Sequence, residues 1–97
     1  MFIVLLRFST RKAQAPQWMT QHNAWLKSGF DDGVFLAAGS LKPSAGGMIL
    51  AHDLSREALD ERVTQDPFVV EDVVTAEILE VTPGLTDPRL AFLKPGT

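Results

Sequence analysis

His22 and Asp66 are the residues of this sequence best suited to acid–base chemistry. Imidazole is the side chain that changes charge most easily near neutral pH, and a carboxylate can hold it in one tautomer or stabilise its conjugate acid. Each residue also has a structural explanation. A buried histidine can donate to a backbone carbonyl, and an aspartate before a proline can bind the N–H groups of a turn. The elements around the two residues must decide between these roles.

Residues 16–30 predict an amphipathic helix that places His22 in an apolar environment. At about 100° per residue, the apolar residues of this segment share one sector of roughly 140°, and His22 lies in its middle. The residues of this sector are Trp18, Met19, Trp25, Leu26, Gly29 and Phe30. Pro16 suits the first helical turn, and Gly29 can end the helix in a left-handed conformation. The imidazole is therefore expected to contact either a structural partner or a pocket.

The segment from Gly39 to Gly47 is a third place where a ligand could bind. It contains a proline and three glycines, and it is predicted to be a loop that is long for a hairpin. The glycines would let backbone N–H groups approach a ligand, while Ser40 adds a hydroxyl group and Lys42 a cation. The spacing of the glycines does not match a nucleotide-binding fingerprint. A flexible hairpin connection is the alternative.

The composition limits the class of protein. With 97 residues, 45% of them hydrophobic, the chain is expected to form one small domain. The absence of cysteine leaves neither disulfides nor thiolate metal sites, and it fits a cytoplasmic location. A net charge of −3 argues against a nucleic-acid partner. The apolar run 2–6 is too short to span a membrane, and no group of His, Asp and Glu residues has the spacing of metal ligands.

The predicted elements follow the order strand, helix, strand, strand, helix, strand. The strands are expected over residues 2–8, 34–38, 48–52 and 73–81, and the first helix over residues 16–28. Ser55 is expected to cap the second helix and Pro67 to close it. This is the split βαβ pattern of a ferredoxin-like α+β domain, in which an antiparallel four-stranded sheet carries two helices on one face. Arg7 and Glu77 are expected to pair between neighbouring strands.

The first strand predicts a second copy of the chain. Residues 2–6 are apolar on both faces of the strand, whereas a strand with one wetted face alternates. Because both helices cover the same face of the sheet, the simplest cover for the other face is a homodimer with sheet packed against sheet. We assign residues 1–82 to the ferredoxin-like domain. The tail 83–97 has one apolar patch and is expected to pack on its own subunit or on the partner subunit.

Four short motifs in this order resemble those of the YCII-related (YciI-like) proteins. They are His22, Ala38-Gly39-Ser40, Gly46-Gly47 and Asp66-Pro67-Phe68, and the resemblance covers residues 1–82. It implies a dimeric α+β barrel with an active site around a histidine and an aspartate, which by position are His22 and Asp66. Many members have Gly-Pro where this chain has Gly39-Ser40. Most members have no established reaction, and a few act on small aromatic compounds as dehydrochlorinase-like lyases.

Two functions of different classes are consistent with these residues. In the first, the chain is a lyase or isomerase that needs no cofactor, with His22 as general acid/base and Asp66 holding its tautomer. The residues expected to bind its small-molecule substrate are Gly39, Ser40, Gly46, Gly47 and Phe68. The aromatic residues Trp18, Trp25 and Phe68 could line this pocket but suit the core better. In the second, the same pocket of the homodimer binds a small ligand without catalysis. A third interpretation, a structural dimer, requires His22 and Asp66 to be too far apart to interact and to have no cavity beside them.

Overall fold

The computed structural model describes residues 1–95 of the chain. Its main elements follow one another as β1 (Phe2–Phe8), α1 (Ala15–Asp31), β2 (Phe35–Leu41), β3 (Gly46–Ala51), α2 (Arg56–Thr64), α3 (Pro67–Val70) and β4 (Val74–Glu80). Two short 3-10 segments are η1 (Lys12–Gln14), which precedes α1, and η2 (Pro88–Leu93), which follows β4. Within residues 1–95, no helix has the length and apolar character needed to cross a membrane.

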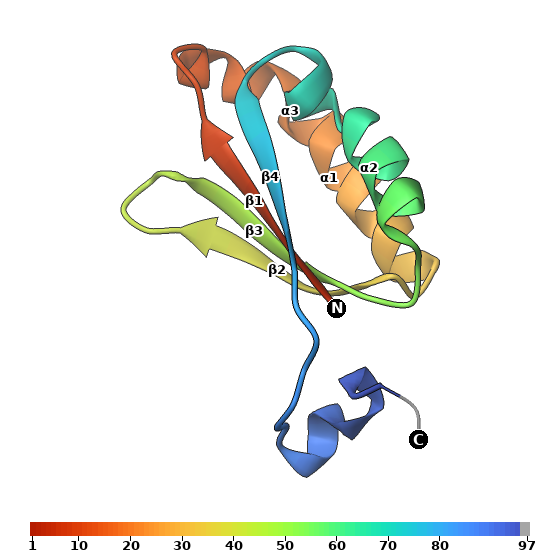
Figure 1. Cartoon of the computed structure of the whole chain (residues 1–97). Coiled ribbons are helices and arrows are strands. Elements are labelled where there is room, and N and C mark those ends of the chain that lie inside the picture. Colours follow the sequence, from red (N-terminus) through yellow and green to blue (C-terminus); the bar gives the residue numbers. More distant parts are fainter. Residues whose placement is uncertain (96–97) are drawn as a thin grey trace.

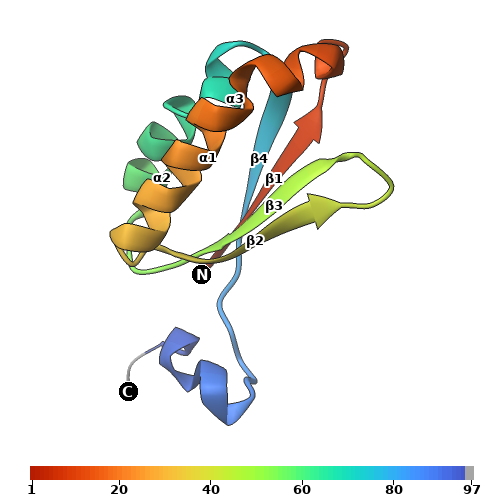
Figure 2. The same cartoon turned by 180° about the vertical axis from the view of Figure 1, so that it is seen from behind.

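The four strands form one antiparallel sheet in the order β2-β3-β1-β4. Each helical crossover passes over one strand, so that β3 lies between β1 and β2, and β1 lies between β3 and β4. Figures 1 and 2 show α1, α2 and α3 together on one face of the sheet, while no other element of residues 1–95 covers the opposite face. The expected ferredoxin-like α+β fold is therefore confirmed.

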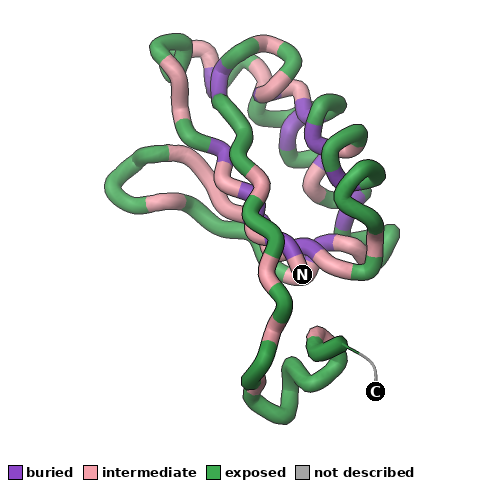
Figure 3. The backbone as a smooth tube through the Cα atoms, viewed as in Figure 1, coloured by how far each residue is buried: buried purple, intermediate pink, exposed green. Residues whose placement is uncertain are grey.

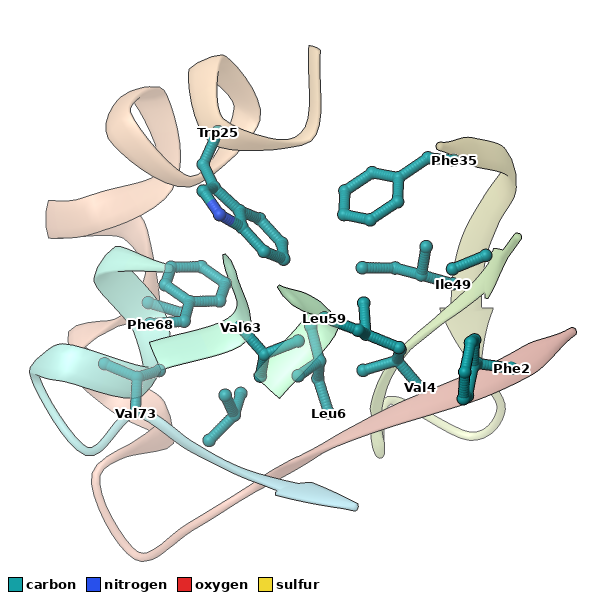
Figure 4. Close-up of a cluster of buried hydrophobic side chains, with 13 residues drawn as sticks. Phe2, Val4, Leu6, Trp25, Phe35, Ile49, Leu59, Val63, Phe68 and Val73 are labelled. Atoms are coloured by element: carbon teal, nitrogen blue, oxygen red, sulfur yellow. The ribbon is translucent and has the colours of Figure 1, made fainter. Parts of the chain in front are cut away.

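The core lies between the helices and the inner face of the sheet. Every second residue of β1 is buried there, namely Phe2, Val4 and Leu6, as the two-residue period of a strand requires. The helical layer supplies the buried apolar side chains Ala15, Trp25, Leu59, Val63 and Phe68. Figure 4 labels the last four of these. Figure 3 shows that the buried positions lie where the two layers face each other. The opposite face of β1 is only partly covered, since Ile3 and Leu5 are half-buried.

Helix α1 differs from its predicted bounds at its C-terminal end. It begins at Ala15, as the proline in its first turn suggests, but it continues to Asp31. The prediction that Gly29 ends the helix is wrong. Gly29 is buried inside the helix, where a Cβ atom would overlap the ring of Phe35. Close packing of helix on strand therefore explains this glycine, and the left-handed residue is Gly33, with a φ of 75°.

The segment from Gly39 to Gly47 is mostly strand, so the prediction of a long loop is wrong. β2 runs to Leu41 and β3 begins at Gly46, which leaves a turn of residues 42–45. Gly46 has a φ of 133°, and a Cβ atom there would overlap the carbonyl oxygen of Leu6. The close approach of β1 thus requires one of the glycines that the pattern attributed to a flexible loop.

The expected second helix is divided in two. Ser55 caps α2 as predicted, because its hydroxyl oxygen accepts the N–H of Ala58 at 3.0 Å, and the helix ends at Thr64. Pro67 does not simply close this helix, because it also begins the separate four-residue helix α3. Its fixed φ and missing N–H suit the first turn, and Asp66 before it is extended and serves as the N-cap of α3.

After β4 the chain leaves the two layers and ends in η2 (Figure 1). Leu85 of this arm is 95% exposed, and the ring of Phe92 contacts the ring of His52 edge-on, at 5.5 Å between centroids. His52 itself, predicted to be a solvated strand terminus, is hydrogen-bonded through Nε2 to the carbonyl oxygen of Gly33 at 3.0 Å. Packing of the tail on a partner subunit stays a prediction, and residues 96–97 of the tail lie outside the described residues.

Candidate functional site

His22 and Asp66 are in direct contact although 44 positions separate them in the sequence. His22 is 9% exposed on α1, and Asp66 is fully buried at the start of α3. The Nδ1 atom of His22 lies 2.7 Å from Oδ1 of Asp66. This distance is within hydrogen-bonding range, so the condition required by a purely structural dimer, in which the two residues do not interact, is not met.

The carboxylate of Asp66 is oriented by the backbone of α3. Its Oδ1 also accepts the N–H of Phe68 at 3.0 Å, which is the N-cap bond of the helix. Its Oδ2 is buried and has no hydrogen-bond partner among residues 1–95. The Asp-Pro-Phe sequence therefore directs one carboxylate oxygen toward the imidazole, because the proline begins the helix and the next N–H holds the aspartate.

The imidazole of His22 is also held by aromatic neighbours. The ring of Phe68 is parallel to it, with an interplanar angle of 4° and 4.0 Å between ring centroids. The ring of Trp25, one turn of α1 away, lies 5.9 Å from the imidazole at 28°. Phe68 and Trp25 are both buried, as their alternative role in the core required. The plane of the imidazole is thus restrained by stacking and its direction by Asp66.

The contact with Asp66 determines which nitrogen of His22 is available for chemistry. A carboxylate can only accept, so Nδ1 donates and carries a proton. In the neutral imidazole the lone pair is then on Nε2. No hydrogen bond to Nε2 occurs within the described part of the chain, and His22 lines a pocket. Nε2 is therefore the atom of the pair that can exchange a proton with a bound molecule.

The pocket lies between α1 and the inner face of the sheet and has a volume of about 260 Å³. It is lined by Leu6, Phe8, Met19, His22, Asn23, Leu26, Ala38, Gly39, Ser40, Gly46, Gly47, Met48, Ile49, Phe68 and Val74. Six of the seven predicted site residues are in this set. The seventh, Asp66, lies behind His22 and does not line the pocket. Trp18, Trp25 and Lys42, which were also considered, are not lining residues.

Nine of the fifteen lining residues were not predicted as site residues, and Asn23 and Met19 are two of them on α1. Asn23 lies outside the apolar sector of α1, and Met19 was assigned to the core side of the helix although it is 40% exposed. The lining residues of α1 therefore come from both inside and outside the apolar sector. The helical period predicts which face of α1 is directed to the sheet, but it does not predict at which residues along that face a pocket lies.

The ion pair expected between the first and fourth strands is present. Arg7 and Glu77 form the expected pair at 2.5 Å, and both side chains are about half exposed. Within residues 1–95, no group of three or more His, Cys, Asp and Glu residues could hold a metal ion.

Comparisons with known proteins agree with this architecture. The model of the YCII-related domain matches residues 1–83. No curated protein matches the chain. Among solved structures, 5-chloro-2-hydroxyhydroquinone dehydrochlorinase (TftG) from Burkholderia phenoliruptrix AC1100, in complex with 2,5-dihydroxybenzoquinone, is similar with a TM-score of 0.69. The sequence identity is 14%, and the alignment covers 87% of this chain and 96% of that chain. At this identity the likeness shows a shared fold.

Proposed function

This chain belongs to the YCII-related domain family, and on that basis we propose that it is a cofactor-independent lyase or isomerase for small, largely apolar or aromatic substrates. The observation that carries the proposal is the geometry of one imidazole. His22 is held at Nδ1 by the buried carboxylate of Asp66, 2.7 Å away, while the same ring lines a pocket of about 260 Å³. This is the arrangement that general acid/base catalysis by histidine requires.

In the proposed reaction, Nε2 of His22 takes a proton from a carbon or hydroxyl group of the substrate. The electron pair left behind forms a new double bond as a leaving group departs with its bonding electrons, and the imidazolium then gives its proton to the leaving group or to water, which completes an elimination. In an isomerisation, the imidazolium instead returns the proton to another atom of the substrate. Both routes balance protons and electrons without an external oxidant or reductant.

Asp66 has the role of a positioning residue in this proposal. Its carboxylate keeps the Nδ1 proton in place and stabilises the positive charge that His22 acquires when it takes the substrate proton. Ser40 and the backbone near Gly39, Gly46 and Gly47 bind the polar end of the substrate. These residues lie on β2 and β3, across the pocket from α1.

The proposal includes a homodimer in which the outer faces of two sheets pack together. Ile3 pairs with Leu50 on one side and with Leu79 on the other, and directly paired residues share a face. Leu79 is 41% exposed, and Ile3, Leu5 and Leu50 are half-buried. We call these four residues the outer apolar patch. A second copy of the chain is the cover that we propose for it.

The test is turnover of candidate substrates, beginning with 5-chloro-2-hydroxyhydroquinone and related halogenated hydroquinones, followed as halide release. We expect His22→Gln to lower kcat by about 10²- to 10⁴-fold, the usual contribution of a general acid/base. His52→Gln is the matched control, because it changes the other histidine of the chain, which does not line the pocket. Equal turnover by wild type and His22→Gln would contradict the proposal. Binding without turnover over the whole panel would favour a ligand-binding module.

A further inference from the structure

We infer that the pocket selects uncharged ligands, namely small and largely apolar molecules that carry hydrogen-bonding groups but no carboxylate or phosphate. The inference rests on the proposed function in that it specifies the ligand class of the same site. It follows from three observations: the side chains that line the pocket, the net charge of the His22–Asp66 pair, and the partners of the neighbouring cations.

The lining side chains are mostly apolar. Within the described chain, the polar side chains of the lining are those of His22, Asn23 and Ser40, and no Lys, Arg, Asp or Glu belongs to it. His22 and Asn23 come from α1 and Ser40 comes from β2, so the hydrogen-bonding groups lie on two different elements. A pocket of this kind encloses an apolar body and orients it through a few polar contacts.

The acid–base pair supplies no net positive charge in either protonation state of the imidazole. With the buried carboxylate of Asp66 ionised, the pair carries one negative charge when His22 is neutral and no net charge when His22 is protonated. A ligand carboxylate beside His22 would therefore meet a neutral or negative pair, whose two side chains lie 2.7 Å apart and are almost fully buried. Transfer of an anion from water to such a place is unfavourable unless a cation compensates it.

The basic residues next to the lining segments of the chain do not provide this compensating charge. Lys12 donates from Nζ to the carbonyl oxygen and the hydroxyl group of Ser44, at 2.7 and 3.1 Å. Arg7 pairs with Glu77, and its place in β1 between two inward-facing residues directs it to the outer face of the sheet. Lys42 is exposed in the turn after β2 and does not line the pocket.

The experiment compares two probes of nearly equal shape, 4-hydroxybenzamide and 4-hydroxybenzoate, which differ by one negative charge. Both are titrated into the full-length protein at neutral pH and followed by amide chemical shifts. We expect the amide to bind with shifts at residues of the pocket, and the carboxylate to bind at least about tenfold more weakly, a difference of about 1.4 kcal/mol.

A charge introduced at the pocket tests the cause of this preference. Met19→Lys places an ammonium group at a lining position that is 40% exposed. It should improve the relative affinity for 4-hydroxybenzoate by about threefold or more. Leu85→Lys adds the same charge in the tail, at a residue that is 95% exposed, and should leave the preference unchanged. Asn23→Lys provides a second lining position if Met19→Lys does not fold.

Equal affinity for the two probes, tighter binding of the carboxylate, or binding of neither probe would each overturn the inference. An equal change of preference in the Met19→Lys and Leu85→Lys proteins would also overturn it, because a pocket-specific charge would then not be its cause. A clear preference for the amide, in a protein whose turnover is the same with and without His22, would leave the inference standing while the proposed catalytic function fails.

Discussion

At the scale of single residues, Asp66 combines full burial with an unusual distribution of hydrogen bonds. One oxygen accepts from both His22 and Phe68, and the other has no partner within residues 1–95. A buried polar atom without a partner destabilises the folded state. In the proposed reaction, the carboxylate would stabilise the positive charge that His22 acquires.

Asp66→Asn separates the charge of this residue from its shape. The amide oxygen can still accept the N–H of Phe68, but it carries no charge to stabilise the imidazolium of His22. We expect kcat to fall by about 10²-fold or more with the fold retained. Ring ¹⁵N chemical shifts of His22 should show a weaker hydrogen bond at Nδ1, because a neutral amide oxygen is a weaker acceptor than a carboxylate. Unchanged kcat together with unchanged ring shifts would show that Asp66 has only a structural role.

At the scale of elements, the short helix α3 makes two contacts to the acid–base pair. The side chain of Phe68 stacks on the imidazole, and its backbone N–H binds the carboxylate of Asp66. A helix of four residues is not stable alone, so its position depends on packing against the rest of the domain. The buried ring of Phe68 provides this packing and orients the imidazole at the same time.

Phe68→Leu keeps an apolar side chain but removes the parallel ring. We expect the free energy of unfolding, measured in urea, to fall by about 1 kcal/mol or more, because the aromatic pair and some buried area are lost. If the ring orients His22, kcat should fall more than KM rises. Phe30→Leu is the control on α1, at a ring that is 42% exposed and outside the pocket. A loss of stability with kcat unchanged would assign Phe68 to the core alone.

At the scale of the whole molecule, the two faces of the sheet differ in how far they are covered by other elements. Helices cover the inner face, and no helix of residues 1–95 lies on the outer face (Figure 2). The outer apolar patch of Ile3, Leu5, Leu50 and Leu79 lies on that outer face. Contiguous apolar area of this kind is usually buried by association. A two-fold axis through the sheet would place the patch of one copy on the same patch of the other.

Light scattering after size-exclusion chromatography should give twice the chain mass of 10.6 kDa at micromolar concentration. Leu79→Glu should shift the protein toward the mass of one chain, because an unpaired carboxylate would be buried in the interface. Leu85→Glu makes the same chemical change in the exposed tail and should keep the mass of the wild type. Wild-type protein with the mass of a single chain would refute the dimer.

The sequence by itself determined the order of the main strands and helices and indicated His22 and Asp66 as candidates for acid–base chemistry. Short apolar runs, the period of α1, the cap at Ser55 and the proline at residue 67 are local signals, and each depends on interactions within a few positions. They were sufficient for the ferredoxin-like fold and for the choice of His22 and Asp66 as candidates. These signals gave wrong predictions where the residue type depends on a contact with a residue distant in the sequence. At position 29 the ring of Phe35 leaves no room for a Cβ atom, and at position 46 the carbonyl oxygen of Leu6 leaves none.

Only the tertiary structure decided that His22 and Asp66 touch and that the hairpin strands line a pocket. The two residues are 44 positions apart, and their separation depends on how α1 packs against α3. The lining depends on the register of β2 with β3, which brings Gly39, Ser40, Gly46 and Gly47 to one end of the sheet. Helix packing and strand register depend on contacts throughout the core, so they cannot be predicted from patterns within a few residues of the sequence.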